Sequence, residues 1–147
     1  MLLLENGSGE EERLRGILDA RTTLLVSTEN LGYAGGSNLL LREALARGAD
    51  AIYLLNNDAE ATEGFLDEPL RLLADPRVGF VESLILTADG ARIDTAGHEH
   101  LTSGDVLPGG RDLPAGAVTA NREILSGCAA GLVLNPATPV GWLDHVM

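Results

Sequence analysis

Short apolar runs and amphipathic segments alternate along the first 86 residues, and this alternation constrains the fold more than any other feature. The patterns predict strands at residues 2–4, 22–27, 51–55 and 78–86, with helices after residue 10, from about 36 to 47, and after Thr62. Ser8 is predicted to cap the first helix, and the strand at 51–55 to be buried on both faces. Further along, residues 127–134 are small and apolar and predict a buried strand or a tight turn followed by a strand. Strands that alternate with helices are typical of a sheet whose strands are joined by right-handed crossovers. The chain is therefore predicted to be an α/β protein, with a mostly parallel sheet flanked by helices.

Composition narrows the class of protein. A chain of 147 residues suffices for one domain with an apolar core and is too short for two. Its net charge of -12 argues against a nucleic-acid partner, because phosphate-binding surfaces need clustered cations. Cys128 is the only cysteine, which excludes a disulfide within the chain and favours a reducing, cytoplasmic location.

Polar residues follow the predicted strands. Glu5 and Asn6 come after the first strand, Asn30 after the second, and residues 56–58 after the third. The carboxyl ends of parallel strands meet at one edge of a sheet, and ligands bind beyond that edge. These polar residues are therefore predicted to form one site.

Residues 56–58, Asn-Asn-Asp, carry the strongest local signal. Asp58 would lie at the mouth of a buried strand, where a carboxylate suits Mg²⁺ or Mn²⁺ bridging the oxygens of a diphosphate. A plain turn explains the same residues equally well, because Asn and Asp favour turns. The three residues alone leave both interpretations open.

Residues 29–38 form a glycine-rich connection between a strand and a helix. Gly35 and Gly36 are predicted to open the helix, whose first N–H groups can meet an anion, and Asn38 would lie about one turn inside. The alternative is a connection that merely packs tightly. The segment lacks the lysine of a phosphate-binding loop and the dinucleotide-binding pattern, which excludes a P-loop NTPase or an ordinary NAD enzyme.

Taken in order, residues 5–8, 29–38 and 54–58 resemble family 2 glycosyltransferases, and most closely the rhamnosyltransferase-like members of bacterial polysaccharide pathways. Residues 75–79, 94–97 and 126–130 fit the same pattern. The resemblance implies a GT-A fold and transfer of a sugar, with inversion, from a dTDP-rhamnose-like or UDP-sugar-like donor. It also implies a divalent metal cofactor, Mg²⁺ or Mn²⁺, and a glycan or lipid-linked acceptor.

The resemblance also implies roles for individual residues. Glu5 falls on the strand-end acid that contacts the nucleotide base, and Asp58 on the last acid of the metal-binding motif, with Asn56 as a weaker ligand. The remaining residues implied in nucleotide-sugar binding are Asn6, Asn30, Gly35, Gly36, Asn38 and Asn57. The segment near the donor sugar and acceptor corresponds to Gly127, Cys128 and Ala129.

The same resemblance predicts a single partial domain over residues 1–147. It would comprise a donor-binding region at about 1–96, a mobile loop at about 97–119 and a partial acceptor region at about 120–147. The family has one more strand and helix before the position of Met1. Its general base follows a stretch like residues 140–144, so the base is expected beyond Met147 and this chain is expected to have little transferase activity. The full-length relative would associate peripherally with the inner membrane face.

Several features of the sequence allow other interpretations. His98 and His100 flank Glu99 and suggest a metal site, but two solvated loop residues are the interpretation favoured. Cys128, among small apolar residues, is read as a buried thiol rather than a nucleophile. The alternative function is a catalytically inactive nucleotide-sugar-binding remnant or structural fragment. A sugar-1-phosphate nucleotidyltransferase would need a basic glycine-rich loop near the start, which the sequence lacks.

Overall fold

The computed structural model describes residues 1–137, which form two compact units. Unit 1 comprises residues 1–52 and unit 2 residues 53–137. Both units contain helix and strand, so the predicted α/β class is confirmed. The single partial domain predicted over residues 1–147 stays a prediction. Residues 140–144, compared above with a family motif, lie outside the described residues.

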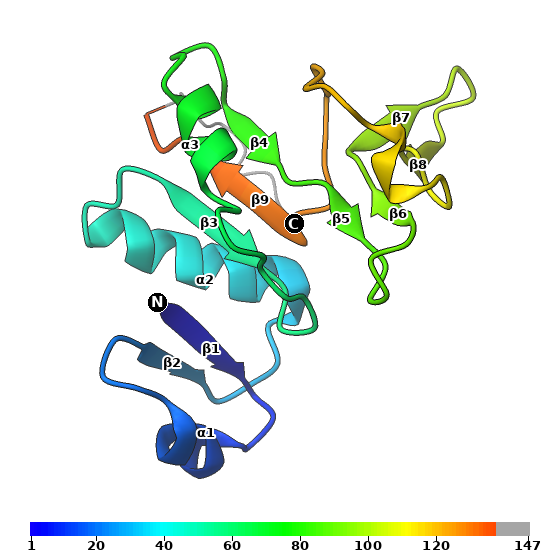
Figure 1. Ribbon diagram of the computed structural model, residues 1–147. Helices are drawn as coiled ribbons and strands as arrows, with labels where there is room; N and C mark the ends of the chain where they lie inside the picture. The colour runs from blue at the N-terminus through cyan, green and yellow to red at the C-terminus, as the bar shows by residue number, and fades with distance from the viewer. Residues whose placement is uncertain (138–147) are drawn as a thin grey trace. The chain divides into compact units, whose positions relative to one another are not determined.

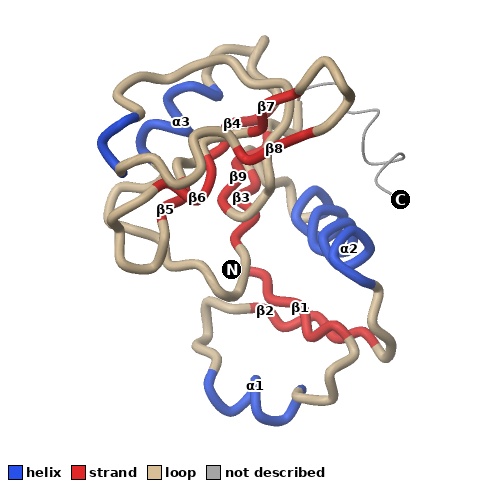
Figure 2. Tube along the Cα trace, turned by 90° about the vertical axis from the view of Figure 1, so that its right-hand side faces the viewer, coloured by secondary structure: helices blue, strands red, loops and turns tan. Residues whose placement is uncertain are grey.

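Unit 1 is a β–α–β–α segment built on one pair of parallel strands (Figures 1 and 2). Its elements are β1 (Leu2–Asn6), α1 (Glu11–Ile17), β2 (Thr23–Ser27) and α2 (Gly32–Ala46). Leu4 lies opposite Leu25 and Asn6 opposite Ser27, so the carboxyl ends of β1 and β2 coincide. This is the parallel arrangement predicted for these two strands.

Two helix starts in unit 1 differ from prediction. Ser8 does not cap α1, because its hydroxyl donates to the carboxylate of Glu5 instead. Helix α2 begins at Gly32, one turn before the predicted start. The side chain of Asn30 accepts the N–H of Gly32 at 2.8 Å and satisfies one of the early N–H groups. Asn38 consequently lies deeper in the helix than predicted.

Unit 2 contains small sheets and one α-helix. Its elements are β3 (Ile52–Leu55, which starts at the last residue of unit 1), α3 (Asp67–Leu73), β4 (Phe80–Glu82), β5 (Ile85–Leu86), β6 (Ile93–Thr95), β7 (His98–His100), β8 (Val106–Pro108), the 3₁₀-helix η1 (Ala115–Ala117) and β9 (Gly131–Leu134). The strand order of the three-stranded sheet is β3–β9–β4, while β5 pairs with β6 and β7 with β8. The pairs β4–β9, β5–β6 and β7–β8 are antiparallel, so a mostly parallel sheet is not what unit 2 forms.

The central strand of unit 2 is β9 rather than β3. All four residues of β9 are buried and Val133 is 0% exposed, which confirms a buried strand in the second half of the stretch 127–134, while residues 127–130 are half-buried and precede the strand. Leu55 of β3, predicted to be buried on both faces, is 45% exposed. The reason is that β9, far along the chain, takes the central position and leaves β3 at an edge of its sheet.

Three further differences have local causes. Helix α3 starts at Asp67 rather than at Thr62, and Gly64, with φ of +73°, interrupts the intervening turn. The predicted strand at 78–86 is divided, because β4 pairs with β9 whereas β5 pairs with β6. The predicted loop at 97–119 contains the β7–β8 hairpin, which turns through Gly104 at φ of +91°.

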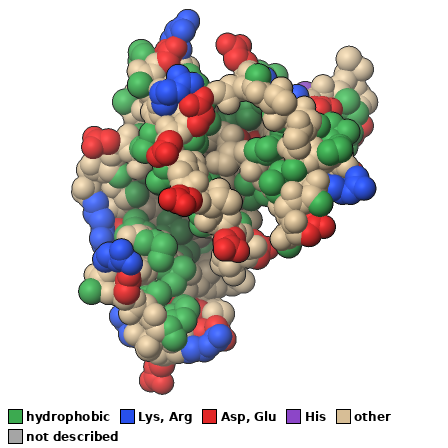
Figure 3. Space-filling view, viewed as in Figure 1, with side chains coloured by type: hydrophobic (Ala, Val, Ile, Leu, Met, Phe, Trp, Pro, Cys, Tyr) green, Lys and Arg blue, Asp and Glu red, His purple; other side chains and the backbone are tan. Residues whose placement is uncertain are grey.

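Acidic side chains dominate the surface charge. The chain has 22 Asp and Glu against 10 Lys and Arg, and Figure 3 shows carboxylates spread over the visible face with arginines beside several of them. Pairs such as Arg13–Glu10, at 2.8 Å, are exposed and contribute little to stability. Among the described helices, none has the length and apolar character needed to cross a membrane.

Candidate functional site

The first group of predicted residues lies at the carboxyl ends of β1 and β2. The side chain of Asn6 donates to the carbonyl of Gly32 at 3.2 Å and, more weakly, to Oδ1 of Asn30 at 3.4 Å. Its own Oδ1 accepts the N–H of Leu31 at 3.0 Å. Two residues predicted to bind the donor, Asn6 and Asn30, are therefore brought together beside the start of α2.

Glycines allow the backbone to approach closely at this edge. A Cβ on Gly36 would lie 3.0 Å from a methyl carbon of Leu4 and 3.3 Å from Nδ2 of Asn6. A Cβ on Gly7 would lie 2.4 Å from the carbonyl carbon of Glu29. Gly36 therefore packs tightly against Leu4 and Asn6, as the alternative interpretation of residues 29–38 predicts. By contrast, Gly35 faces only Leu31, whose Cβ would lie 3.0 Å away.

Two other predicted nucleotide contacts are buried in unit 1. Glu5 is 3% exposed, and its Oε1 accepts both the N–H and the hydroxyl of Ser8 at 2.5 Å. The hydroxyl of Ser8 lowers the pKa of Glu5 below its ordinary value. Asn38 is 8% exposed. Glu5 therefore fixes the turn after β1, and its contact with a base stays a prediction.

A second group meets in unit 2, where the carboxyl ends of β3 and β4 lie beside the amino end of β9. The N–H of Asn56 donates to the carbonyl of Ala130 at 3.3 Å, and the N–H of Ser83 to that of Gly131 at 2.8 Å. The structure thus brings residues 56–58, the predicted metal-binding motif, beside the segment at 127–130. The sequence predicts both segments as parts of a site, and they are far apart in the chain.

Asp58 lies in the turn that follows β3. The N–H of Ala59 donates to the carbonyl of Asn56 at 3.2 Å, and Asn57 and Asp58 are exposed. Within residues 1–137, no three or more His, Cys, Asp or Glu side chains are grouped as a metal site. One exposed carboxylate still fits Mg²⁺, which keeps several waters and takes further oxygens from a substrate phosphate. The metal role of Asp58 and Asn56 stays a prediction.

Glu82 holds the segment at 127–130 from the other side. Its Oε1 accepts the N–H of Cys128 at 2.8 Å, while its Oε2 is buried without a hydrogen-bond partner among the described residues. A Cβ on Gly127 would lie 2.5 Å from that Oε2, so glycine is required for this contact. The sequence prediction missed Glu82. Its signal was a lone charge inside an apolar strand, which is uncommon unless the charge has a partner.

Cys128 is half-buried next to Glu82. Burial, and then the hydrogen bond to Glu82, raise the pKa of its thiol to about 11. The thiol is therefore protonated at neutral pH, when it is a poor nucleophile. This agrees with the prediction that Cys128 is not a catalytic nucleophile.

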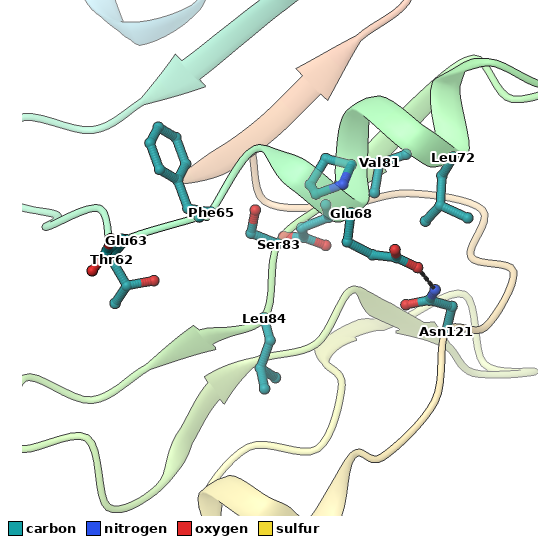
Figure 4. Close-up of a pocket in the computed structure, with 12 residues that line it drawn as sticks. Thr62, Glu63, Phe65, Glu68, Leu72, Val81, Ser83, Leu84 and Asn121 are labelled. Atoms are coloured by element: carbon teal, nitrogen blue, oxygen red, sulfur yellow. Dashed lines mark hydrogen bonds between the residues drawn. The ribbon is translucent and has the colours of Figure 1, made fainter.

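A pocket of about 280 Å³ lies on the α3 side of unit 2 (Figure 4). Its walls carry the carboxylates of Glu63, Glu68 and Glu82. Figure 4 shows Asn121 reaching Glu68, whose Oε1 accepts the Asn121 amide at 2.6 Å. Hydrogen bonds from Arg71 and then Asn121 lower the pKa of Glu68 to about 2. None of the predicted site residues lines this pocket, but Glu82 joins it to Cys128.

No family model matches the chain, and no solved structure matches it significantly. A stretch of 21 residues is 81% identical to ribulose-phosphate 3-epimerase 1 of Cupriavidus necator. Over the same length it is 76% identical to ribulose-phosphate 3-epimerase 2 of that organism. Each match covers 14% of this chain and 9% of the epimerase. The chain thus spans less than a tenth of these relatives, and the matches do not show a family.

Proposed function

We propose that this chain carries the donor-binding part of an inverting, nucleotide-sugar-dependent glycosyltransferase with a GT-A-like fold. One observation supports this most directly: Asn6 and Asn30 converge at the carboxyl ends of two parallel strands, next to the start of α2. Ligands of α/β sheets bind at such edges. The N–H groups at a helix start also favour a negatively charged ligand.

In this proposal, the residues of unit 1 bind the nucleotide. Asn6 and Asn30 offer amide groups for hydrogen bonds to a base or ribose, and Gly35 and Gly36 let the ligand approach the backbone. Asp58 would hold a divalent cation, which neutralises charge on the departing diphosphate. The donor would be a dTDP-rhamnose-like or UDP-sugar-like molecule.

The acceptor would lie near Gly127, Cys128 and Ala129. The adjoining pocket offers carboxylates and the hydroxyl of Ser83, which suit the hydroxyl groups of a glycan. Transfer also requires a general base that deprotonates the attacking hydroxyl, a contribution of about 10²–10⁴-fold in rate. In the family that the chain resembles, this base follows a stretch like residues 140–144. A cytoplasmic role in polysaccharide biosynthesis, beside the inner membrane face, follows from the same resemblance.

A second function, nucleotide-sugar binding without transfer, is favoured by Glu5. The family's strand-end acid contacts the base, whereas the carboxylate of Glu5 is buried and bonded to Ser8. A chain that uses this acid to fix its own turn has fewer groups left for the donor. Binding would then rest on Asn6 and Asn30.

Calorimetry with UDP-glucose and with dTDP-rhamnose, each with and without Mn²⁺, tests the proposal. We expect saturable binding that depends on Mn²⁺ and weakens at least about tenfold, or 1.4 kcal/mol, in Asp58→Asn. Asp50→Asn is the matched control, because Asp50 is an exposed aspartate just before β3 whereas Asp58 follows it. Because little transfer is expected of this chain, the metal dependence of binding separates the two functions. Mn²⁺-independent binding that Asp58→Asn leaves unchanged contradicts the first function and supports the second. Absence of binding contradicts both.

A further inference from the structure

Two histidines of unit 2 converge on one hydroxyl. His98 and His100 are the first and last residues of β7, so their side chains share a face of the strand. Nδ1 of His98 lies 3.0 Å and Nε2 of His100 lies 2.9 Å from Oγ of Ser126. The two histidines therefore lie in a strand and not in the loop that the sequence predicted, although His100 is solvent-exposed as expected.

The backbone around these imidazoles is held on both sides. On one side, β7 pairs with β8, with His98 opposite Pro108 and His100 opposite Val106. On the other side, the N–H of His98 donates to the carbonyl of Ser126 at 3.0 Å. The convergence thus depends on hydrogen-bonded backbone as well as on side-chain contacts.

The chemistry of two converging imidazoles is that of a metal chelate. Imidazole nitrogen is a preferred ligand of Cu²⁺, Ni²⁺ and Zn²⁺, whereas Mg²⁺ prefers oxygen. The zinc–nitrogen distance is about 2.0–2.1 Å, so a cation bound by both rings would lie closer to them than Oγ of Ser126 does. His100 is exposed and His98 half-exposed, which gives metal and water access.

We propose that His98 and His100 chelate a divalent transition metal, with oxygen contacts from Ser126 and from water. Within residues 1–137 no third His, Cys, Asp or Glu joins them as a metal group. The site is therefore an open, exchangeable chelate rather than a closed structural zinc site with four protein ligands. Ser126 has a single hydroxyl hydrogen, so it donates to at most one of the two rings, and the tautomer of each imidazole sets the direction of its hydrogen bond.

This site is independent of the proposed glycosyltransferase function. It involves none of the residues implied in donor binding, and its imidazoles prefer Cu²⁺, Ni²⁺ and Zn²⁺, whereas the carboxylate of Asp58 suits Mg²⁺ or Mn²⁺. Mg²⁺ should therefore neither fill the His98–His100 site nor displace a transition metal from it.

Calorimetric titration of the full chain with CuCl₂, NiCl₂ or ZnCl₂ tests the proposal. We expect one high-affinity metal per chain, with Cu²⁺ bound more tightly than Ni²⁺ or Zn²⁺. His98→Ala and His100→Ala should each weaken binding at least about tenfold. Glu99→Gln is the matched control, because Glu99 lies between the histidines but on the opposite face of β7. His145→Ala controls for the third histidine of the sequence.

A second measurement does not depend on the folding of the variants. In the unaltered chain, substoichiometric Cu²⁺ should broaden the imidazole NMR resonances of His98 and His100 before that of His145. Broadening confined to His145, or affinity unchanged in both His98→Ala and His100→Ala, would overturn the proposal. Equal displacement by Mg²⁺ would do so as well.

Discussion

In each unit, predicted site residues lie at the edge of a sheet. The two edges are stabilised by different kinds of hydrogen bond. In unit 1 the edge depends on side-chain amides, with Asn6 and Asn30 bonded to each other and to the start of α2. In unit 2 it depends on backbone hydrogen bonds, from Asn56 and Ser83 to the residues before and at the start of β9.

Burial differs in the same sense. The buried side chains of unit 1 include the polar residues Glu5 and Asn38 as well as Leu41. Those of unit 2 are mainly apolar, with Ile93 and Val133 both 0% exposed. Buried polar groups need partners, so they fix geometry more than they add stability. Unit 1 is therefore expected to depend on a few specific hydrogen bonds, and unit 2 on packing around β9.

The largest effect is expected from the packing of β9. Leu134→Ala should lower the free energy of unfolding by about 2–5 kcal/mol, because Leu134 is 4% exposed and its loss leaves a cavity. Urea denaturation measures this change. Leu125→Ala is the control, since Leu125 is 83% exposed and should have little effect. Equal effects of the two substitutions would mean that β9 is not the centre of the unit 2 core.

The next effect concerns close approach in unit 1. Gly7→Ala should destabilise by about 1–3 kcal/mol or more, because φ is +73° and the new Cβ would lie 2.4 Å from backbone of Glu29. Gly9→Ala shares the backbone conformation, with φ of +77°, but its Cβ would meet nothing within 4 Å. The difference between the free energies of unfolding of the two variants, measured by urea denaturation, gives the cost of the contact between the new Cβ of residue 7 and Glu29. If the two variants are equally stable, the edge of unit 1 does not require a glycine at this contact.

A smaller effect is expected from the amide of Asn6. Asn6→Asp keeps the acceptor for the N–H of Leu31 but removes the donor to the carbonyl of Gly32 and to Oδ1 of Asn30. The loss should be about 0.5–1.5 kcal/mol or slightly more, because the 3.4 Å bond to Asn30 is weak and adds little to the usual net value of one hydrogen bond. Asn57→Asp, at an exposed turn position, serves as the control. Urea denaturation measures this loss. An unchanged midpoint of denaturation in Asn6→Asp would show that side-chain amides do not stabilise unit 1.

The smallest effect is expected from the thiol of Cys128 in unit 2, and it should change stability only at high pH. The pKa of Cys128 is about 11 in the folded chain against an ordinary 9.0, so the folded state favours the neutral thiol. The resulting stability is present below pH 9 and is lost as the pH rises from 9 towards 11. Denaturation across this range should show a decline that Cys128→Ser lacks. A decline of the same size in Cys128→Ser would assign it to other groups.

Local patterns predicted much of unit 1 and less of unit 2. The strand that ends in Glu5 and Asn6 and its parallel partner were predicted from apolar runs and the turn residues that follow them. The prediction that Ser8 caps the first helix was wrong, because the hydroxyl of Ser8 donates to the carboxylate of Glu5. In unit 2, the hairpin around Gly104 was missed because its strands lack regular alternation.

Some residues of the candidate site were predictable from the sequence and others were not. The amide and acidic residues after the strands were visible as residue types, and their positions at strand ends followed from the local pattern. Glu82 was visible only as a lone charge inside an apolar strand and Ser126 carried no signal, because their partners, Cys128 and the two histidines, are distant in sequence. That Asp58 binds a cation at this site stays a prediction.

Residue order was enough to establish the α/β class, the turn after most strands and the buried character of residues 131–134, since backbone propensity and hydrophobic period act over a few neighbouring residues. Which strand became central, and which side chains met at Ser126, depended on contacts between distant segments. The physical reason is that these contacts form only when the whole unit packs. Their energies depend on shape and on hydrogen bonds across strands, which no short window of sequence contains.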